Sequence, residues 1–324
     1  MSRASSISSF STDVLDTVRS QASIHTGLRL TLLGQRVVTD DNFHVDFCSG
    51  DGNIILMSSD NVKFYTHTFI LKVASGLFRA THTLPQRSGV IPLVHGLHVL
   101  ALPEDARTIN AILRLISGME IPALNNFDDI EKVLLTAKKW GMPGPPSIIH
   151  RMITPQTLLD DPVRLYALAC RVGWSEATVI AANHTLDVDL QHEDVQPILH
   201  SIDSQDLLKL LNLRTRRRDA LLEFLLSFTV PGCLSHLPQL EGQRPTEHEL
   251  SVQWQWKAFM FTAFIAMDRH PSGKTLLGPQ SVLQSDLEDM RSVRCPHFDG
   301  EPAFDIDGLE RELETTLGAL PRII

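Results

Sequence analysis

The stretch SDNVKFYTHTFILKVASGLF, residues 59–78, changes its hydrophobic period at His67. Before this histidine, Val62, Phe64 and Thr66 alternate with other residues, a pattern typical of a strand with one buried face. After it, apolar residues recur at the three- and four-residue spacing of a helix. The residues of that expected buried stripe are Ile70, Val73, Ala74, Leu77 and Phe78. The chain must therefore pass from sheet to helix within a few residues, which indicates an α+β fold.

Further strand signals lie on either side of this stretch. Ile54–Met57 is a short apolar run, and Asp60-Asn61 after it favours a turn, so we expect a β-hairpin. Another strand is predicted near Val94–Leu102. His95 and His98 would then point to opposite faces of the sheet, because side chains alternate along a strand.

Two helices should follow the last strand. Pro103-Glu104-Asp105 is suited to open the first, and Gly118 can end it. Asn126 can cap the second, Phe127–Trp140, and Gly141 can close it. Their expected buried residues are Ile109, Ile112, Leu113 and Ile116 in the first helix and Ile130, Val133, Leu134 and Ala137 in the second.

Beyond the breaker GMPGPPS (141–147) the sequence predicts only helices. Their start and stop signals are caps at Asp161, Ser175 and Ser204, Pro162 at a first helical position, Gly173 past a helix end, and capping boxes at Thr246/Glu249 and Ser285/Glu288. We expect a disordered tail over 1–40, an α+β domain over 41–145, a helical extension over 146–229, a Pro/Gly-rich linker over 230–245 and a C-terminal helical region over 246–324.

The composition of the chain argues against several classes of function. The 324 residues carry a net charge of −9, so binding to phosphate backbones is not expected. No run of about 18 apolar residues occurs, so no membrane partner is expected. The Ser-rich start contains Asp13 and Asp16, which argue against a transit peptide. The four cysteines are scattered without a CxxC pair, which favours a reducing intracellular location, in cytoplasm or nucleus.

Catalytic and ligand motifs are weak. DRHPSGKT (268–275) approaches a phosphate-binding loop, but Asp268 stands where its first glycine belongs. Cys295-Pro-His297 has no obvious partner pair for zinc, and no Gly-x-Ser-x-Gly elbow is present. We therefore predict no catalytic residue, metal or cofactor.

The basic run RTRRRD (214–219) could contact nucleic acid or an acidic partner, but we favour a solvated helix face, partly neutralised by Asp219 and Glu223.

The order of these elements resembles a BTB/POZ domain. The matching phrases are SSDNVKFYTHTFILKVASGLF, LPQ at 84–86, LPEDARTINAILRLISG and VLLTAKKWGM. The chain is similar to the large set of BTB-containing proteins of mushroom-forming fungi, in which a helical C-terminal part follows. Here that part includes DDPVRLYALACRVGWSEATVIAANHTL, WQWKAF and LERELETTLGAL.

The resemblance assigns roles to several residues. It implies that His67 is a structural marker at the strand-to-helix junction, and it matches Ser75, Leu77 and Phe78 to the Ser-x-x-Phe helix of the family. Charged-pocket members have an acid and a base where this chain has Asn53 and Thr68, which argues against that repressor function. Cullin-binding members have an acidic residue where Leu84-Pro85-Gln86 has glutamine. The candidate partner-binding residues are Phe78, Leu84, Pro85 and Gln86.

Three functions follow as hypotheses. The first is a non-catalytic protein-interaction scaffold whose BTB domain self-associates or binds another protein. The second is a substrate adaptor of a cullin-type ubiquitin ligase, which depends on Leu84-Pro85-Gln86. The third, from another class, is an enzyme with an unrecognised site in the C-terminal helices.

Overall fold

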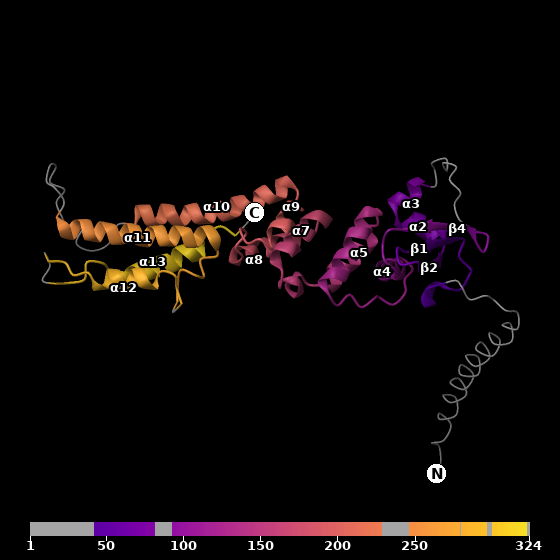
Figure 1. Ribbon diagram of the computed structural model, residues 1–324, viewed down its shortest axis with the longest axis horizontal. Coiled ribbons are helices and arrows are strands. Elements are labelled where there is room, and N and C mark those ends of the chain that lie inside the picture. The colour runs from indigo at the N-terminus through magenta and orange to yellow at the C-terminus, as the bar shows by residue number, and fades with distance from the viewer. Residues whose placement is uncertain (1–41, 82–92, 229–245, 279, 297–299, 323–324) are drawn as a thin grey trace, which may run out of the picture. The chain divides into compact units, whose positions relative to one another are not determined.

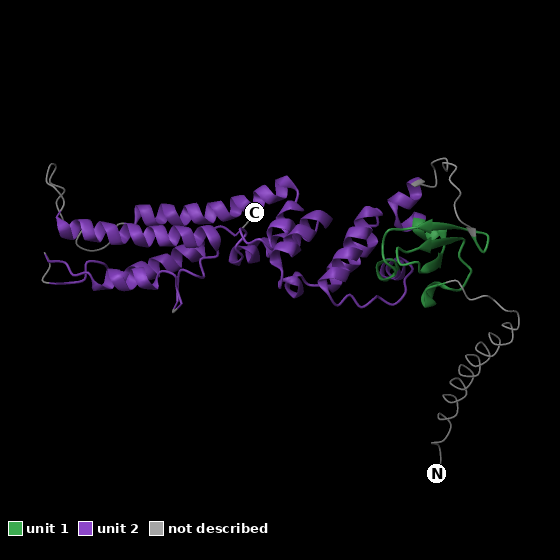
Figure 2. Cartoon of the chain, in the orientation of Figure 1, with its two compact units in different colours: residues 1–71, 84–109 green, residues 72–83, 110–324 purple. Residues whose placement is uncertain are grey.

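The computed structural model describes residues 42–81, 93–228, 246–278, 280–296 and 300–322 (Figure 1). The expected tail (1–40), the linker (230–245) and the Leu84-Pro85-Gln86 motif lie outside the described residues. The chain divides into two compact units, residues 1–71 with 84–109 and residues 72–83 with 110–324 (Figure 2). The domain boundaries drawn from the sequence remain predictions.

A small sheet forms the centre of the first unit. Strands β1 (Ile54–Met57), β2 (Lys63–Thr66), β3 (Leu93–Val94) and β4 (Leu97–Ala101) are arranged in the order β2-β1-β4-β3. The predicted hairpin is confirmed, since β1 and β2 pair antiparallel. β4 pairs parallel with β1. With helices around this sheet and after it, the α+β class is confirmed.

The predicted strand Val94–Leu102 is broken at His95-Gly96. These two residues have φ angles of 51° and 76°, and Val94 pairs with Leu97 across them, so β3 and β4 form a tight hairpin. Positive φ at both central positions is the geometry that such two-residue turns require. The prediction that His95 lies on a strand is therefore wrong. Its Nδ1 lies 2.5 Å from the Tyr65 hydroxyl.

The predicted helix after His67 is two helices, α2 (Thr68–Ala74) and α3 (Gly76–Thr81), separated at Ser75. His67 lies at the junction between β2 and α2, as expected. The predicted buried stripe is wrong in part, because Val73 is 63% exposed and Leu77 is 42% exposed. Leu71 is the buried residue of α2, and Val73, two positions later, lies on the opposite side of that helix. At and after the break, the buried residues are Ser75 and Phe78.

The next helices are α4 (Ala106–Ile116), α5 (Phe127–Lys139) and α6 (Gly144–Met152). The Asn126 cap is confirmed, since its Oδ1 accepts from the Asp129 N–H at 2.8 Å. The four residues predicted for the buried face of α5 are all buried, whereas Ile116 of α4 is half-buried. GMPGPPS does not end the helical packing, because α6 begins within it at Gly144 and its prolines occupy the first turn, where no N–H partner is needed.

Four helices follow: α7 (Pro162–Val172), α8 (Ser175–His184), α9 (Gln196–His200) and α10 (Ser204–Ser227). Short 3-10 segments are η2 (Val45–Phe47), η3 (Pro155–Leu158) and η4 (Thr185–Asp187). The signals around α7 are confirmed, with Asp161 as cap and Gly173 past its end at φ 77°. Ser175 and Ser204 are not caps but first helical residues, and Asp203 caps α10 through the Gln205 N–H.

The last helices are α11 (Glu247–Arg269), α12 (Gln284–Ser292) and α13 (Ile306–Ala319). α11 lies against α10 and α12 (Figure 1). The Thr246/Glu249 capping box is confirmed. The Ser285/Glu288 box is wrong, because α12 begins at Gln284 and the Glu288 carboxylate accepts from the Gln284 amide instead. Among the helices in the described part of the chain, none has both the length and the apolar composition needed to cross a membrane.

Candidate functional site

The first candidate region is the joint between α3 and the end of α5. The Ser75 hydroxyl donates to the Trp140 carbonyl and accepts from the Phe78 N–H at 3.1 Å. The Gly76 N–H donates to the Gly141 carbonyl at 3.0 Å, and the Leu77 N–H donates to the Trp140 carbonyl at 3.3 Å. The first N–H groups of one helix thus meet the last carbonyls of another, which satisfies both sets of otherwise unpaired groups. We call this arrangement the serine joint.

Packing reverses the roles that the sequence suggested for Phe78 and Leu77. Phe78 is only 4% exposed, and its ring meets the edge of Trp140 with centroids 5.6 Å apart. It therefore stabilises the serine joint, and its assignment as a direct partner contact is corrected. Leu77 reaches the surface instead. The other partner-binding candidates, Leu84, Pro85 and Gln86, lie outside the described residues, so the adaptor hypothesis remains a prediction.

Helix α2 carries further exposed apolar side chains. Phe69 is 74% exposed, and Val73, one turn later on the same helix, is 63% exposed. Large apolar side chains that stay in water on adjacent turns are a common feature of protein-binding helices. These side chains, with Leu77, make up the α2–α3 apolar residues.

The junction before α2 is held by polar contacts. The Asn53 side chain accepts from the Thr68 N–H at 2.8 Å and donates to the Thr68 hydroxyl at 3.1 Å. Asn53 and Thr68 therefore form a neutral hydrogen-bonded pair. The His67 carbonyl accepts from the Leu71 N–H at 3.2 Å, and its ring lies 4.0 Å from the Asp51 carboxylate. A hydrogen bond from Ser49 lowers the pKa of that carboxyl.

The second candidate region is the basic run on α10. The prediction of a solvated helix face is wrong for two of its arginines, because Arg214 is 8% exposed and Arg217 is 4% exposed. Arg214 donates to the carbonyls of Thr185 at 2.7 Å, Val188 at 3.1 Å and Arg269 at 2.7 Å.

Arg217 has a similar role on the next turn. Its guanidinium donates to the carbonyls of Pro271 at 2.7 Å, Ser272 at 3.3 Å, Leu320 at 3.2 Å and Pro321 at 2.7 Å. All the carbonyls that Arg214 and Arg217 contact lie at or just beyond the C-terminal ends of helical segments: Thr185 follows α8, Val188 follows η4, and the others end or follow α11 and α13. Helix C-termini carry unpaired carbonyls and partial negative charge, which cations complement. We call this arrangement the arginine joint.

Burial governs the electrostatics of the arginine joint. Desolvation lowers the pKa of Arg214 to about 10. Burial also lowers the pKa of Arg217, and repulsion from Arg322 adds to this effect. Arg214 nevertheless remains a cation at neutral pH. It therefore serves as a fixed donor of hydrogen bonds and not as a general base.

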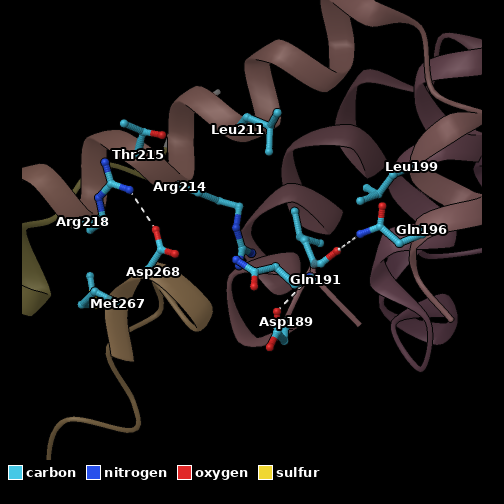
Figure 3. A pocket seen from close by; sticks show the side chains of 11 residues that line it. Asp189, Gln191, Gln196, Leu199, Leu211, Arg214, Thr215, Arg218, Met267 and Asp268 are labelled. Carbon is cyan, nitrogen blue, oxygen red and sulfur yellow. Dashed lines mark hydrogen bonds and ion pairs between the residues drawn. The ribbon is translucent and has the colours of Figure 1, made fainter. Parts of the chain in front are cut away.

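A cavity of about 270 Å³ lies beside Arg214 (Figure 3). On one side, Arg218 is paired with Asp268 at 2.8 Å. On the other, the Asp189 carboxylate accepts from the Gln191 N–H, also at 2.8 Å. The charged groups of the lining are used in these internal contacts, so the arrangement favours a structural role over acid–base chemistry. No cluster of three or more potential metal ligands occurs in the described part of the chain.

The sequence does contain a signal for the buried arginines. The buried residues of α10 before and after them are Leu210, Leu213, Leu221 and Leu225. Arg214 and Arg217 continue this stripe at helical spacing, so their positions, and not their charge, indicate the core-facing side. No protein-family model matches this sequence, and no curated protein matches it either.

Proposed function

We propose that this chain is a non-catalytic protein-interaction protein, with a BTB/POZ-type domain over residues 41–145 that self-associates or binds another protein. The observation that carries the proposal is the set of α2–α3 apolar residues, of which Val73 and Leu77 are 63% and 42% exposed. Burial of such side chains against a partner is favourable by about 25 cal/mol per Å² of apolar surface.

The order of elements supports the proposal. The described chain runs β1, β2, α2, α3, β3, β4, α4 and α5. With α2 and α3 taken as one helical segment and β3 and β4 as one strand segment, this is the order on which the resemblance rests. The serine joint adds to this support, because it gives the Ser-x-x-Phe segment a concrete packing role. A rigid α3 would in turn hold Leu77 in a fixed position for a partner.

The experiment is a light-scattering mass of the purified chain over a range of concentrations, with calorimetric titration of a cullin N-terminal domain. We expect either a mass above that of the monomer or binding of the added domain. Changing Val73→Ser together with Leu77→Ser should weaken the part of that association that runs through α2 and α3 at least tenfold, because both side chains would contribute to the buried centre of that contact.

Met152→Ser is the matched control, since Met152 is 48% exposed on α6 and lies outside this set. It should leave association unchanged. If cullin binding is found and is lost with Leu84→Ala, the adaptor hypothesis is supported. A chain that stays monomeric at every concentration and takes up no added domain would contradict the proposal.

A further inference from the structure

Helix α11 is apolar on two opposite faces. One face is fully buried in the core that α10, α12 and α13 share, and it consists of Val252, Phe259, Ala263 and Met267. The other face is in solvent. Its exposed side chains are Leu250 at 52%, Trp254 at 74%, Phe261 at 67% and Ile265 at 41%. We call these four residues the outer stripe.

The outer stripe forms one continuous line. Its members are spaced by four, seven and four residues, so they lie on one side of the helix over roughly 22 Å. The two rings alone bring roughly 300 Å² of apolar surface into solvent, which is the size of the largest patch on a typical monomer. A single exposed ring would need no explanation, but two rings flanked by two aliphatic side chains do.

The order of side chains in the stripe is symmetric. Leu250 and Ile265 lie at equal distances from a midpoint between Lys257 and Ala258, and so do Trp254 and Phe261. A two-fold contact between identical chains requires such a self-complementary surface. In an antiparallel pair of α11 helices, each aromatic residue of the stripe would face an aromatic residue, and each aliphatic residue an aliphatic one. We propose that the outer stripe is a self-association surface, occupied by the α11 helix of a second copy of this chain.

The charged residues along the stripe are compatible with this pairing. Glu247 at one end would face Asp268 at the other, but Asp268 is already paired with Arg218 at 2.8 Å. Arg269 is the next residue and is exposed. Lys257 lies near the midpoint, where its long aliphatic chain can cover apolar surface while its amino group stays in water.

The size of the surface limits the affinity. Stable interfaces bury about 800 Å² per partner, and the outer stripe supplies roughly half of this. The contact should therefore be reversible, with a dissociation constant in the micromolar range and not the nanomolar range. Such a dimer would form through α11 independently of the α2–α3 apolar residues.

Trp254 provides a built-in probe. Of the four tryptophans, Trp140 and Trp174 are buried and Trp256 is partly buried, which leaves Trp254 as the one that reports on the stripe. We would use the full chain carrying Val73→Ser and Leu77→Ser, so that failure of the proposed function cannot affect the result. On raising the concentration from about 1 to 200 µM, the emission should shift to the blue as the mass doubles.

Two further variants test whether the outer stripe causes the emission shift and the doubling of mass. Phe261→Ser should abolish both the shift and the doubling, while Leu208→Ser, which changes a leucine 57% exposed on α10, should leave both intact. If Phe261→Ser leaves the doubling intact, or if the chain stays monomeric throughout, the proposal is overturned.

Cross-linking tests the antiparallel geometry. In a chain with Cys48 and Cys233 changed to serine, a mixture of Leu250→Cys and Ile265→Cys variants should form a disulfide between the two variants under oxidation. Leu250→Cys alone should not cross-link to itself, because the two copies of residue 250 lie at opposite ends of the pair. Cross-linking of Leu250→Cys to itself in preference to Ile265→Cys would overturn the antiparallel contact.

Discussion

The serine joint and the arginine joint satisfy the same kind of backbone group in different ways. At the serine joint, the carbonyls of Trp140 and Gly141 at the end of α5 receive neutral donors, namely the first N–H groups of α3 and one hydroxyl. At the arginine joint, carbonyls at the ends of α8, η4, α11 and α13 accept hydrogen bonds from the guanidinium groups of Arg214 and Arg217. The first joint buries no charge, whereas the second buries two cations.

The difference lies in how many contacts depend on one side chain. If the hydroxyl of Ser75 is removed, the Trp140 carbonyl still accepts from the Leu77 N–H. If the guanidinium of Arg217 is removed, four carbonyls lose that donor at once. Buried groups left without a partner are costly, and the cost grows with their number. The arginine joint should therefore be the more sensitive of the two to a single substitution.

The largest effect is expected for Arg217→Met. Methionine fills much of the same volume but provides no donor, so we expect a loss of about 3–5 kcal/mol in the free energy of unfolding. Urea denaturation followed by circular dichroism would measure it. Arg216→Met is the matched control, since Arg216 is exposed on the same helix, and it should change the stability by less than about 0.5 kcal/mol. Equal effects of the two substitutions would contradict the arginine joint.

Ser75→Ala should have a smaller effect. The Phe78 N–H loses the Ser75 oxygen as an acceptor at a buried position, so we expect a loss of about 1–3 kcal/mol, measured in the same way. The control is Ser147→Ala, because the exposed Ser147 hydroxyl also donates to a backbone carbonyl, that of Pro143. A loss for Ser75→Ala as large as that for Arg217→Met would remove the distinction between the two joints.

The sequence predicts features whose partners are close along the chain. The β1–β2 hairpin, the Asn126 cap and the Thr246/Glu249 capping box all depend on residues no more than 12 positions apart, and all are confirmed. Local propensity and hydrogen bonding decide these features, so short patterns contain most of the necessary information.

Features with remote partners are harder to predict from the sequence. At Ser75, where the expected helix breaks, the hydroxyl donates to the carbonyl of Trp140. Trp140 lies 65 residues away in the sequence, so no local pattern indicates this contact. The carbonyls that Arg217 contacts lie 54 to 104 residues away, so nothing in RTRRRD itself indicates them. From the sequence alone, a cluster of arginines predicts a solvated helix face, because the positions of the distant helix ends that accept their hydrogen bonds are not known. Only the helical spacing of Arg214 and Arg217 with their buried leucine neighbours indicated the core.

His150 extends the comparison, because this half-buried residue has a buried polar atom that lacks the hydrogen bonds seen at both joints. Its Nε2 has no hydrogen-bond partner among the described residues, and its ring stacks on Trp174 with centroids 4.3 Å apart. Burial lowers the pKa of His150 from 6.5. The folded chain therefore binds fewer protons than the unfolded chain, so this group should lower the stability as the pH falls below about 6.5.

The check is the urea midpoint at about pH 7.5 and pH 5.5. His150→Phe should reduce the loss of stability between these two values, because phenylalanine keeps the stacking and cannot take up a proton. His200→Asn, at an exposed position on α9, should leave the loss as it is in the unchanged chain. A pH dependence that is the same with and without His150→Phe would show that other groups cause it.

The smallest effect is expected for Arg218, the residue next to Arg217. Its guanidinium pairs with the carboxylates of Asp219 and Asp268, both at 2.8 Å, whereas the guanidinium of Arg217 donates to backbone carbonyls. Partly exposed ion pairs typically contribute 0.2–1 kcal/mol. A double-mutant cycle of Arg218→Gln and Asp268→Asn should therefore give a coupling of about 0.5 kcal/mol that decreases at high salt. A coupling of several kcal/mol would mean that Arg218 also belongs to the buried joint, and the contrast between one residue and the next on α10 would not hold.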